Sequence, residues 1–251
     1  MVPVNGISFM ISNRNSMTIL KWVIVMAITL SLPLSDDLHA HECVILLHGL
    51  ARSDSSMLKL AAVLNAQGYA TVNYGYPSTK HSVKKLADEA VGDALSLCPR
   101  GSRVHFVTHS MGGLLVRQYL STQTIANLGR VVMLGTPNKG SQVVDILKNL
   151  PGFRAINGPA GMQLGTEAES CPSQLGAANF DVGIIAGNRS INWILSSMLP
   201  GSDDGKVTVE NTKLKGMSDH VTLPVTHPFM MKNDVVIEQV VNYLKDGLFS
   251  R

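Results

Sequence analysis

The stretch from residue 104 to residue 113 constrains the fold of this chain more than any other. An apolar run typical of a strand, residues 104–108, leads to Ser110, and two glycines and a helix-like run over residues 114–120 follow. A sharp turn between strand and helix lifts a serine Oγ above the edge of a sheet. A serine placed there can be a covalent nucleophile if a base lies within hydrogen-bond reach. The alternative is a tight turn whose serine only caps the helix.

The pattern departs at one position from the G-x-S-x-G arrangement that is usual for such a turn. Thr108 stands where the first glycine is expected, whereas Gly112 holds the second place. Because threonine is bulkier than glycine, we expect the turn to open slightly around it.

Composition and charge restrict the classes of protein to which the chain can belong. The 251 residues are 45% hydrophobic and 16% charged, which suits one domain with a sizeable core. The net charge of +3 is small, and no arginine-rich stripe alternates with aromatic residues, so nucleic-acid binding is not expected. Cysteine and histidine residues do not show zinc-ligand spacing, and we expect neither a metal nor an organic cofactor.

The first 40 residues are predicted to be a signal peptide. No acidic residue precedes Asp36, Lys21 is basic, and residues 22–34 form a run of 13 mostly apolar residues. A membrane-spanning helix needs about 20 apolar residues, so this run suits a secretory signal better than an anchor. We expect cleavage after Ala40 and export of the remaining chain to the periplasm or the medium. An uncleaved membrane anchor is the alternative.

Three cysteines follow this segment: Cys43, Cys98 and Cys171. An exported protein can form disulfides, and an odd number of cysteines leaves at least one thiol unpaired. Cys43 lies at the start of the predicted strand 44–47, and Cys98 lies shortly before the predicted strand 103–108. If these strands are neighbours, the two cysteines lie at the same edge of the sheet and can pair. Buried free thiols fit the sequence equally well.

Strand-like and helix-like segments alternate along the rest of the chain. The predicted strands are residues 44–47, 70–74, 103–108, 131–135, 182–186 and 221–225. Between them, apolar residues recur at the spacing of a helix face, for example in residues 57–64, 83–94 and 237–244. This alternation predicts an α/β fold in which a mostly parallel sheet has helices on both faces.

Residues 138–180 are the one long irregular part of the predicted fold. They begin with a helical pattern over residues 143–150 and continue in a stretch rich in glycine, proline and alanine. Long segments of this kind over the active edge of a sheet are often lids or binding loops, so we predict a short cap or lid here. Plain surface packing is the alternative.

The topology of a parallel sheet selects among the polar residues, because functional sites lie beyond the carboxyl ends of its strands. Ser110, Asp203, Asp204 and His227 each follow a predicted strand. Of the two aspartates we favour Asp204. It directly precedes Gly205, where the chain can bend sharply and direct the carboxylate back toward the histidine.

Four other polar residues are assigned outside this site. Asp181 and His220 directly precede predicted strands, so they are expected at the opposite edge of the sheet. His105 and His109 are expected to pack beside the sheet.

The sequence His48-Gly49-Leu50 ends the first predicted strand at the same edge as Ser110. Acyl transfer needs one backbone N–H from such a loop, and a second from the residue after the nucleophile, to hold the oxyanion. We assign these two donors to Leu50 and Met111. The His48 ring is expected to hold the loop by a hydrogen bond.

These stretches, taken together, resemble a known family. The motifs are His48-Gly49-Leu50, Thr108-His109-Ser110-Met111-Gly112-Gly113, Gly135-Thr136-Pro137-Asn138-Lys139-Gly140-Ser141, Asp204-Gly205-Lys206-Val207 and Thr226-His227-Pro228-Phe229. Over roughly residues 43–248 the chain is similar to bacterial lipase-like α/β-hydrolases, which are serine esterases and lipases.

The resemblance implies an α/β-hydrolase catalytic domain over residues 41–251 with a Ser110–His227–Asp204 triad. It further implies hydrolysis of carboxylic esters, with a small-molecule ester or a lipid as substrate and peripheral contact with a membrane. An acyltransferase that uses the same triad, and a non-catalytic binding member of the fold, are the alternatives. The acyl side of the substrate is expected to be apolar. This expectation rests on four residues placed near the inferred site: Met57, Leu58, Met162 and Met230.

Overall fold

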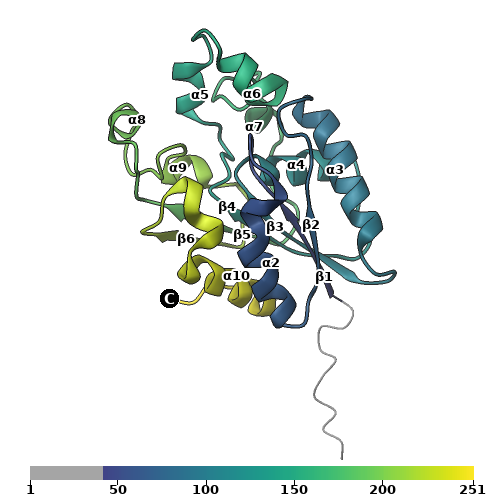
Figure 1. The fold of residues 1–251 in the computed structure, drawn as a ribbon. Helices are drawn as coiled ribbons and strands as arrows, with labels where there is room; N and C mark the ends of the chain where they lie inside the picture. The colour runs from purple at the N-terminus through teal and green to yellow at the C-terminus, as the bar shows by residue number, and fades with distance from the viewer. Residues whose placement is uncertain (1–41) are drawn as a thin grey trace, which may run out of the picture. The chain divides into compact units, whose positions relative to one another are not determined.

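The computed structural model describes residues 42–251. The predicted signal peptide, residues 1–40, and the predicted cleavage after Ala40 lie outside the described residues. Within the described part, a six-stranded sheet lies between two layers of helices (Figure 1).

The sheet is entirely parallel. Its strands are β1 Glu42–Leu47, β2 Ala70–Tyr74, β3 Arg103–His109, β4 Leu128–Leu134, β5 Val182–Gly187 and β6 Asp219–Leu223. They are arranged in the order β2-β1-β3-β4-β5-β6, and each of the five pairings is parallel. The predicted fold class is therefore confirmed, and the carboxyl ends of all six strands meet at one edge.

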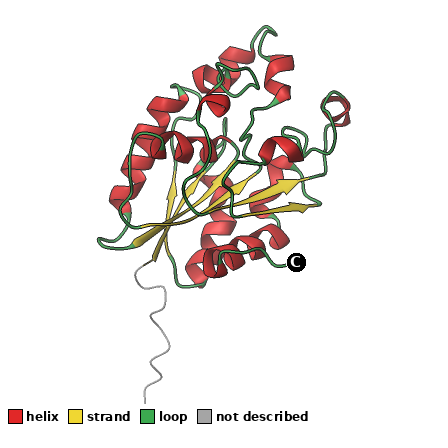
Figure 2. Cartoon of the chain, turned by 180° about the vertical axis from the view of Figure 1, so that it is seen from behind, coloured by secondary structure: helices red, strands yellow, loops and turns green. Residues whose placement is uncertain are grey.

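Two helices cover each face of the sheet (Figure 2). They are α2 Leu58–Ala66, α3 Val83–Leu97, α4 Met111–Leu120 and α10 Asp234–Asp246. Leu86 of α3 and Leu114 of α4 belong to the hydrophobic core on one face, and Leu60 of α2 and Val240 of α10 belong to the core on the other. The helical spacing of apolar residues in the sequence thus corresponds to the buried sides of these helices.

Local signals in the sequence set the ends of these helices. The Ser82 hydroxyl accepts a hydrogen bond from the backbone N–H of Lys85 at the start of α3. At the start of α10, Asn233 Oδ1 accepts from the N–H of Val236. Both are N-caps, which satisfy donors that the first turn leaves free. Gly247 ends α10 in the left-handed conformation, at a φ of 77°.

Strand β6 begins and ends two residues earlier than predicted, at Asp219 and Leu223. His220 therefore lies inside the strand and does not precede it. The prediction began the strand at its apolar residues, but β6 is an edge strand, where polar residues are tolerated. Asp219 accepts a hydrogen bond from the backbone N–H of Phe249 and forms an ion pair with Arg251 at 2.6 Å.

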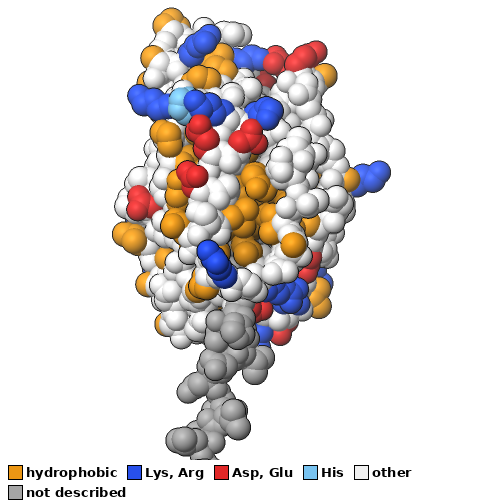
Figure 3. All heavy atoms as spheres, turned by 90° about the vertical axis from the view of Figure 1, so that its right-hand side faces the viewer, with side chains coloured by type: hydrophobic (Ala, Val, Ile, Leu, Met, Phe, Trp, Pro, Cys, Tyr) orange, Lys and Arg blue, Asp and Glu red, His pale blue; other side chains and the backbone are white. Residues whose placement is uncertain are grey.

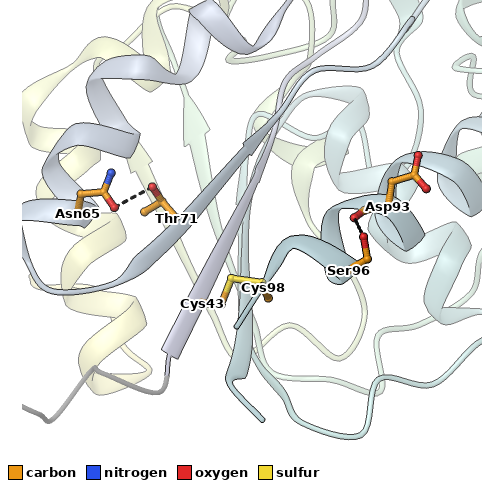
Figure 4. Close-up of a disulfide and its surroundings, with 6 residues drawn as sticks. All are labelled: Cys43, Asn65, Thr71, Asp93, Ser96 and Cys98. Carbon is orange, nitrogen blue, oxygen red and sulfur yellow. Dashed lines mark hydrogen bonds between the residues drawn. A yellow bond between two sulfur atoms is a disulfide. The ribbon is translucent and has the colours of Figure 1, made fainter. Parts of the chain in front are cut away.

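A disulfide joins Cys43 of β1 to Cys98 at the end of α3 (Figure 4). Strands β1 and β3 are neighbours, so the pairing is the one that the strand positions allow. The bond closes a loop with a sequence separation of 55 residues. In the chain-entropy description, a loop of this size stabilises the folded state by about 4 kcal/mol. Cys171 is a free cysteine, and burial raises the pKa of its thiol to about 11.

The side of the molecule with α3 and the edge strand β2 carries both charged and apolar side chains. Figure 3 shows this side, where charged side chains surround a central group of apolar ones. On α3, Lys84 pairs with Asp88 at 2.9 Å and Lys85 pairs with Glu89 at 3.7 Å. Such pairs at i and i+4 each stabilise a helix by about 0.2–0.5 kcal/mol.

The remaining helices are short and follow strand ends. They are η1 Asp54–Met57, α5 Gln142–Leu147, α6 Phe153–Gly161, α7 Cys171–Gln174, α8 Trp193–Ser197, α9 Val209–Thr212 and η2 His227–Lys232. The irregular segment 138–180 contains α5, α6 and α7, which lie beyond the carboxyl edge of the sheet (Figure 1). Within residues 42–251, no helix has the length and apolar character needed to cross a membrane.

Candidate active site

Ser110 lies at the turn between β3 and α4, in a strained backbone conformation. Its φ of 54° and ψ of −122° fall in a region that residues with a Cβ rarely occupy. Such strain costs about 1–3 kcal/mol and is found most often at functional sites. A Cβ at Gly112 would lie 2.5 Å from the carbonyl oxygen of Leu47, so the glycine lets α4 approach the end of β1.

Thr108, which replaces the usual first glycine of the turn, is accommodated inside β3. Its side chain is fully buried, and its hydroxyl donates to the carbonyl oxygen of Val132. Thr136 also stabilises the turn, because its Oγ1 donates to the carbonyl oxygen of Ser110 at 3.0 Å. Sequence reasoning placed Thr136 in a motif but gave it no role.

The structure brings Ser110, His227 and Asp204 into one hydrogen-bonded chain. Nε2 of His227 lies 3.0 Å from Ser110 Oγ, and Nδ1 lies 2.7 Å from Asp204 Oδ2. Since a carboxylate only accepts hydrogen bonds, Nδ1 carries the proton and Nε2 accepts from the serine hydroxyl. Asp204 and His227 are both buried, whereas the serine lines an open cavity.

The two neighbouring aspartates face in different directions. Oδ1 of Asp204 accepts from the backbone N–H groups of Lys206 and Val207, which leaves Oδ2 to face the histidine. Gly205 makes the bend at a φ of 96°, as the sequence argument required. Asp203 faces away from His227, and its carboxylate binds the Ser196 hydroxyl and the N–H of Gly205.

The His109 ring packs against the His227 ring. The ring centroids of His109 and His227 are 4.8 Å apart, and His109 Nε2 donates to the carbonyl oxygen of His227 at 2.9 Å. Burial, and then the nearby His227, lower the pKa of His109 well below its ordinary value. A neutral His109 thus holds the backbone of His227, a contact that sequence reasoning did not foresee.

Three other polar residues, which the sequence predicts to lie outside the site, are hydrogen-bonded elsewhere in the fold. His105 Nδ1 accepts from the backbone N–H of Arg130, and the Tyr243 hydroxyl donates to Asp181 at 2.6 Å. His220 bonds through Nε2 to the Thr212 hydroxyl at 3.0 Å.

The loop after β1 is fixed by the His48 ring. Its Nδ1 donates to the carbonyl oxygen of Gly49, and its Nε2 accepts from the backbone N–H of Tyr76. The rings of His48 and Tyr76 stack with their centroids 4.1 Å apart, and burial lowers the pKa of His48. The loop places Leu50 beside Ser110 in the wall of one cavity. Met111 begins α4, where the first N–H groups have no acceptor within the helix.

A cavity of about 490 Å³ opens at Ser110. Its apolar wall comes mainly from segment 138–180 and contains Val143, Val144, Leu147, Phe153, Ile156 and Leu164. Arg52 and Lys206 are the cationic residues of its lining. The cavity therefore offers an apolar surface beside the serine and cationic side chains at its border.

The apolar residues predicted near the site do not line this cavity. Met57 and Met230 are fully buried in the core. Met230 does lie near the site, because a Cβ at Gly135 would be 2.9 Å from its Sδ and 3.1 Å from His227 Nδ1. Leu58 faces solvent, and Met162 is only half-buried. Position along the chain could not identify the wall, because the wall depends on how segment 138–180 folds over the sheet.

The buried side chain of Arg117 holds segment 138–180 against helix α4. Arg117 of α4 donates to the carbonyl and side-chain oxygens of Asn138 and to the carbonyl oxygen of Gly176. Asn138 in turn donates to the carbonyl oxygen of Thr212 at 2.7 Å. Burial lowers the pKa of Arg117 to about 10. Both ends of the cavity wall are thus held by one side chain.

The sequence and the fold were compared with those of known proteins. No protein-family model matches the sequence, and no curated protein matches it. Solved structures do match. The mature form of lipase BlEst2 from Bacillus licheniformis is 20% identical, with a TM-score of 0.60 over 82% of this chain and 92% of that one. The chain has the α/β-hydrolase fold.

Two further similar structures belong to chains longer than this one. Lipase B of Aspergillus fumigatus is 16% identical with a TM-score of 0.61, and the match covers 81% of this chain and 52% of that one. Phospholipase PlaB of Legionella pneumophila is 18% identical with a TM-score of 0.54, over 68% and 45% of the two chains. In this chain, Ser110, Asp204 and His227 follow β3, β5 and β6, which is the chain order known for catalytic triads on the α/β-hydrolase fold.

Proposed function

We propose that this protein hydrolyses carboxylic esters through an acyl-enzyme formed on Ser110. The observation that carries the proposal is the hydrogen-bonded chain from Ser110 Oγ through His227 to Asp204, with distances of 3.0 and 2.7 Å. A serine with a positive φ at the carboxyl edge of a parallel sheet supports the same role.

The geometry supports the following reaction. His227 Nε2 takes the hydroxyl proton as Ser110 Oγ attacks the ester carbonyl carbon, and Asp204 stabilises the imidazolium. The N–H groups of Leu50 and Met111 hold the oxyanion of the tetrahedral intermediate. When the C–O bond to the alcohol breaks, the imidazolium returns its proton to the leaving oxygen. Water then attacks the acyl-enzyme by the same route and releases the acid and the serine.

The substrate is proposed to carry an apolar acyl chain. The wall contributed by segment 138–180 is apolar, and the similar folds belong to proteins described as lipases and a phospholipase. In this proposal segment 138–180 acts as the cap over the acyl chain. The protein is further proposed to be exported, because the Cys43–Cys98 disulfide suits an oxidising compartment.

A panel of p-nitrophenyl esters from acetyl to palmitoyl tests the activity, and a fluorophosphonate probe tests the nucleophile. We expect hydrolysis of at least part of the panel and covalent labelling at Ser110. Addition of an alcohol acceptor separates hydrolysis from acyl transfer, because a transferase would divert product to the new ester. A protein that hydrolyses none of the esters and is not labelled at Ser110 would contradict the proposal.

The two neighbouring aspartates provide a matched pair for testing the acid. Asp204→Asn keeps an oxygen for the amides of Lys206 and Val207 but removes the charge that orients His227. We expect a loss in kcat of about 10⁴-fold, the size of the effect when a serine-protease triad loses its acid. Asp203→Asn should lose less than about tenfold, because its carboxylate does not reach the histidine. A larger loss at Asp203 would move the acid by one position.

A further inference from the structure

The large apolar side chains that remain exposed are concentrated at one edge of the molecule. Among residues 42–251, twelve such side chains have at least 40% of their surface exposed. Leu97, the last residue of α3, and Leu248, which follows α10, lie at the amino edge of the sheet. The other ten lie in segments that follow strand ends: Leu58, Ile146, Leu150, Ile156, Ile191, Trp193, Ile194, Met198, Phe229 and Val235. The apolar exposure thus surrounds the edge at which the Ser110 cavity opens.

The most exposed part of this edge is the α8 segment, residues 189–198. No residue of α8 itself is buried, and the Trp193 side chain is 77% exposed. Ile191, Ile194 and Met198 are also exposed beside it. In Figures 1 and 2, α8 stands away from the body of the protein on the side where the strand arrows end. Packing among the described residues does not account for this apolar group, and exposed groups of this kind mark interaction sites.

The exposed charged residues next to the α8 segment in the sequence are basic. Residues 182–202 contain no aspartate or glutamate, and Arg189 is exposed. The next acidic residues, Asp203 and Asp204, are buried and hydrogen-bonded, and Lys206 after them is exposed. A tryptophan among aliphatic side chains and cations is typical of segments that lie in the headgroup region of a membrane.

We propose that the α8 segment docks on an anionic lipid surface, with Trp193 at the level of the headgroups. The α8 segment and the Ser110 cavity both lie beyond the carboxyl ends of the strands, so docking brings the cavity toward the lipid; the value of this placement rests on the proposed ester hydrolysis. Arg189 and Lys206 supply the attraction to negative headgroups, worth about 1 kcal/mol for each cation close to the surface.

The chain contains two tryptophans, Trp22 and Trp193, and Trp22 lies in the predicted signal peptide, so after the predicted cleavage Trp193 is the sole source of tryptophan fluorescence. We choose residues 41–251, the form expected after cleavage, with Ser110→Ala, which cannot consume the lipid by the proposed reaction. It is mixed with phosphatidylglycerol vesicles that contain brominated acyl chains. We expect the Trp193 emission to shift to shorter wavelength and to be quenched by the bromine. Vesicles of phosphatidylcholine alone should give a weaker response.

Three results would overturn the proposal. Protein that sediments with the vesicles while the Trp193 emission stays unchanged binds through another part of the chain. Equal responses to neutral and anionic vesicles would remove the role of the cations. A short-wavelength emission without vesicles, together with a sedimentation coefficient that rises with protein concentration, would assign the α8 segment to a second copy of the chain.

Two alanine variants test whether vesicle binding depends on the α8 segment in particular or on any exposed apolar side chain. Trp193→Ala should weaken binding to phosphatidylglycerol vesicles by about tenfold, since it removes a large apolar side chain from the lipid contact. Leu248→Ala, which truncates a side chain with 60% exposure at the opposite edge, should leave binding unchanged. With Ser110 intact, Trp193→Ala should hydrolyse soluble short-chain esters at the wild-type rate. Loss of vesicle binding is thereby distinguished from failure of the proposed activity.

Discussion

Ser110→Ala is expected to lower kcat for ester hydrolysis by about 10⁵- to 10⁶-fold, as when a serine protease loses its nucleophile. The variant loses the oxygen that lies 3.0 Å from His227 Nε2 and with it the acyl-enzyme. Residual hydrolysis should come from the oxyanion donors and substrate binding alone. The backbone contacts of the turn do not involve the side chain, because Ser110 bonds through its N–H to Leu134 and through its carbonyl to Thr136.

The measurement is kcat on the best p-nitrophenyl ester, paired with a thermal melting curve. We expect a normal melting temperature, since alanine and serine have similar requirements at a positive φ. Activity within about tenfold of the wild type, with a normal melting curve, would exclude Ser110 as the nucleophile, because losses of that size lie far below those of a missing nucleophile.

The fold could be predicted because its determinants are local and repeated. Strand β2 coincides with the predicted range, and the apolar spacing marked the buried sides of α2, α3 and α10. The error at β6 arose because an edge strand tolerates polar residues, so apolar runs alone misplace its start. Asp219 and His220 are polar, yet they belong to the strand.

The proximity of Ser110, Asp204 and His227 could be predicted because parallel strands bring their carboxyl ends to one edge of the sheet. That rule selects Ser110 and His227 without any knowledge of side-chain contacts. The choice between the two aspartates needed only the local bend at Gly205. The sequence left the cysteine pairing open because it depends on which strands are neighbours, and β1 and β3 meet only in the folded sheet.

Other features of the site could not be predicted, because they depend on long-range packing. His109 reaches the carbonyl oxygen of His227, 118 residues away in the sequence. Arg117 holds both ends of segment 138–180, and nothing in its local sequence distinguishes it from a surface arginine on α4. The lining of the cavity follows from the same segment, which explains why the methionines expected near the site do not line it.

Two histidines on neighbouring parts of the chain provide the sharpest test of the acid–base assignment. His227→Ala should lower kcat by about 10⁵- to 10⁶-fold, similar to the loss of the nucleophile, because the triad residues act as a unit. His220 lies inside β6 and bonds to the Thr212 hydroxyl, and burial lowers its pKa. His220→Ala should therefore change kcat by less than about tenfold, with its main effect on stability through a lost hydrogen bond.

The comparison is informative because only seven residues separate the two positions, 220 and 227. A histidine general base must lie within hydrogen-bond reach of the hydroxyl that it deprotonates. In the structure Nε2 of His227 meets this condition at 3.0 Å, whereas Nε2 of His220 is bonded to Thr212. Measured kcat values with the reverse ranking would show that the base comes from inside the strand. The alignment of Ser110, Asp204 and His227 would then be a structural contact without a role in proton transfer.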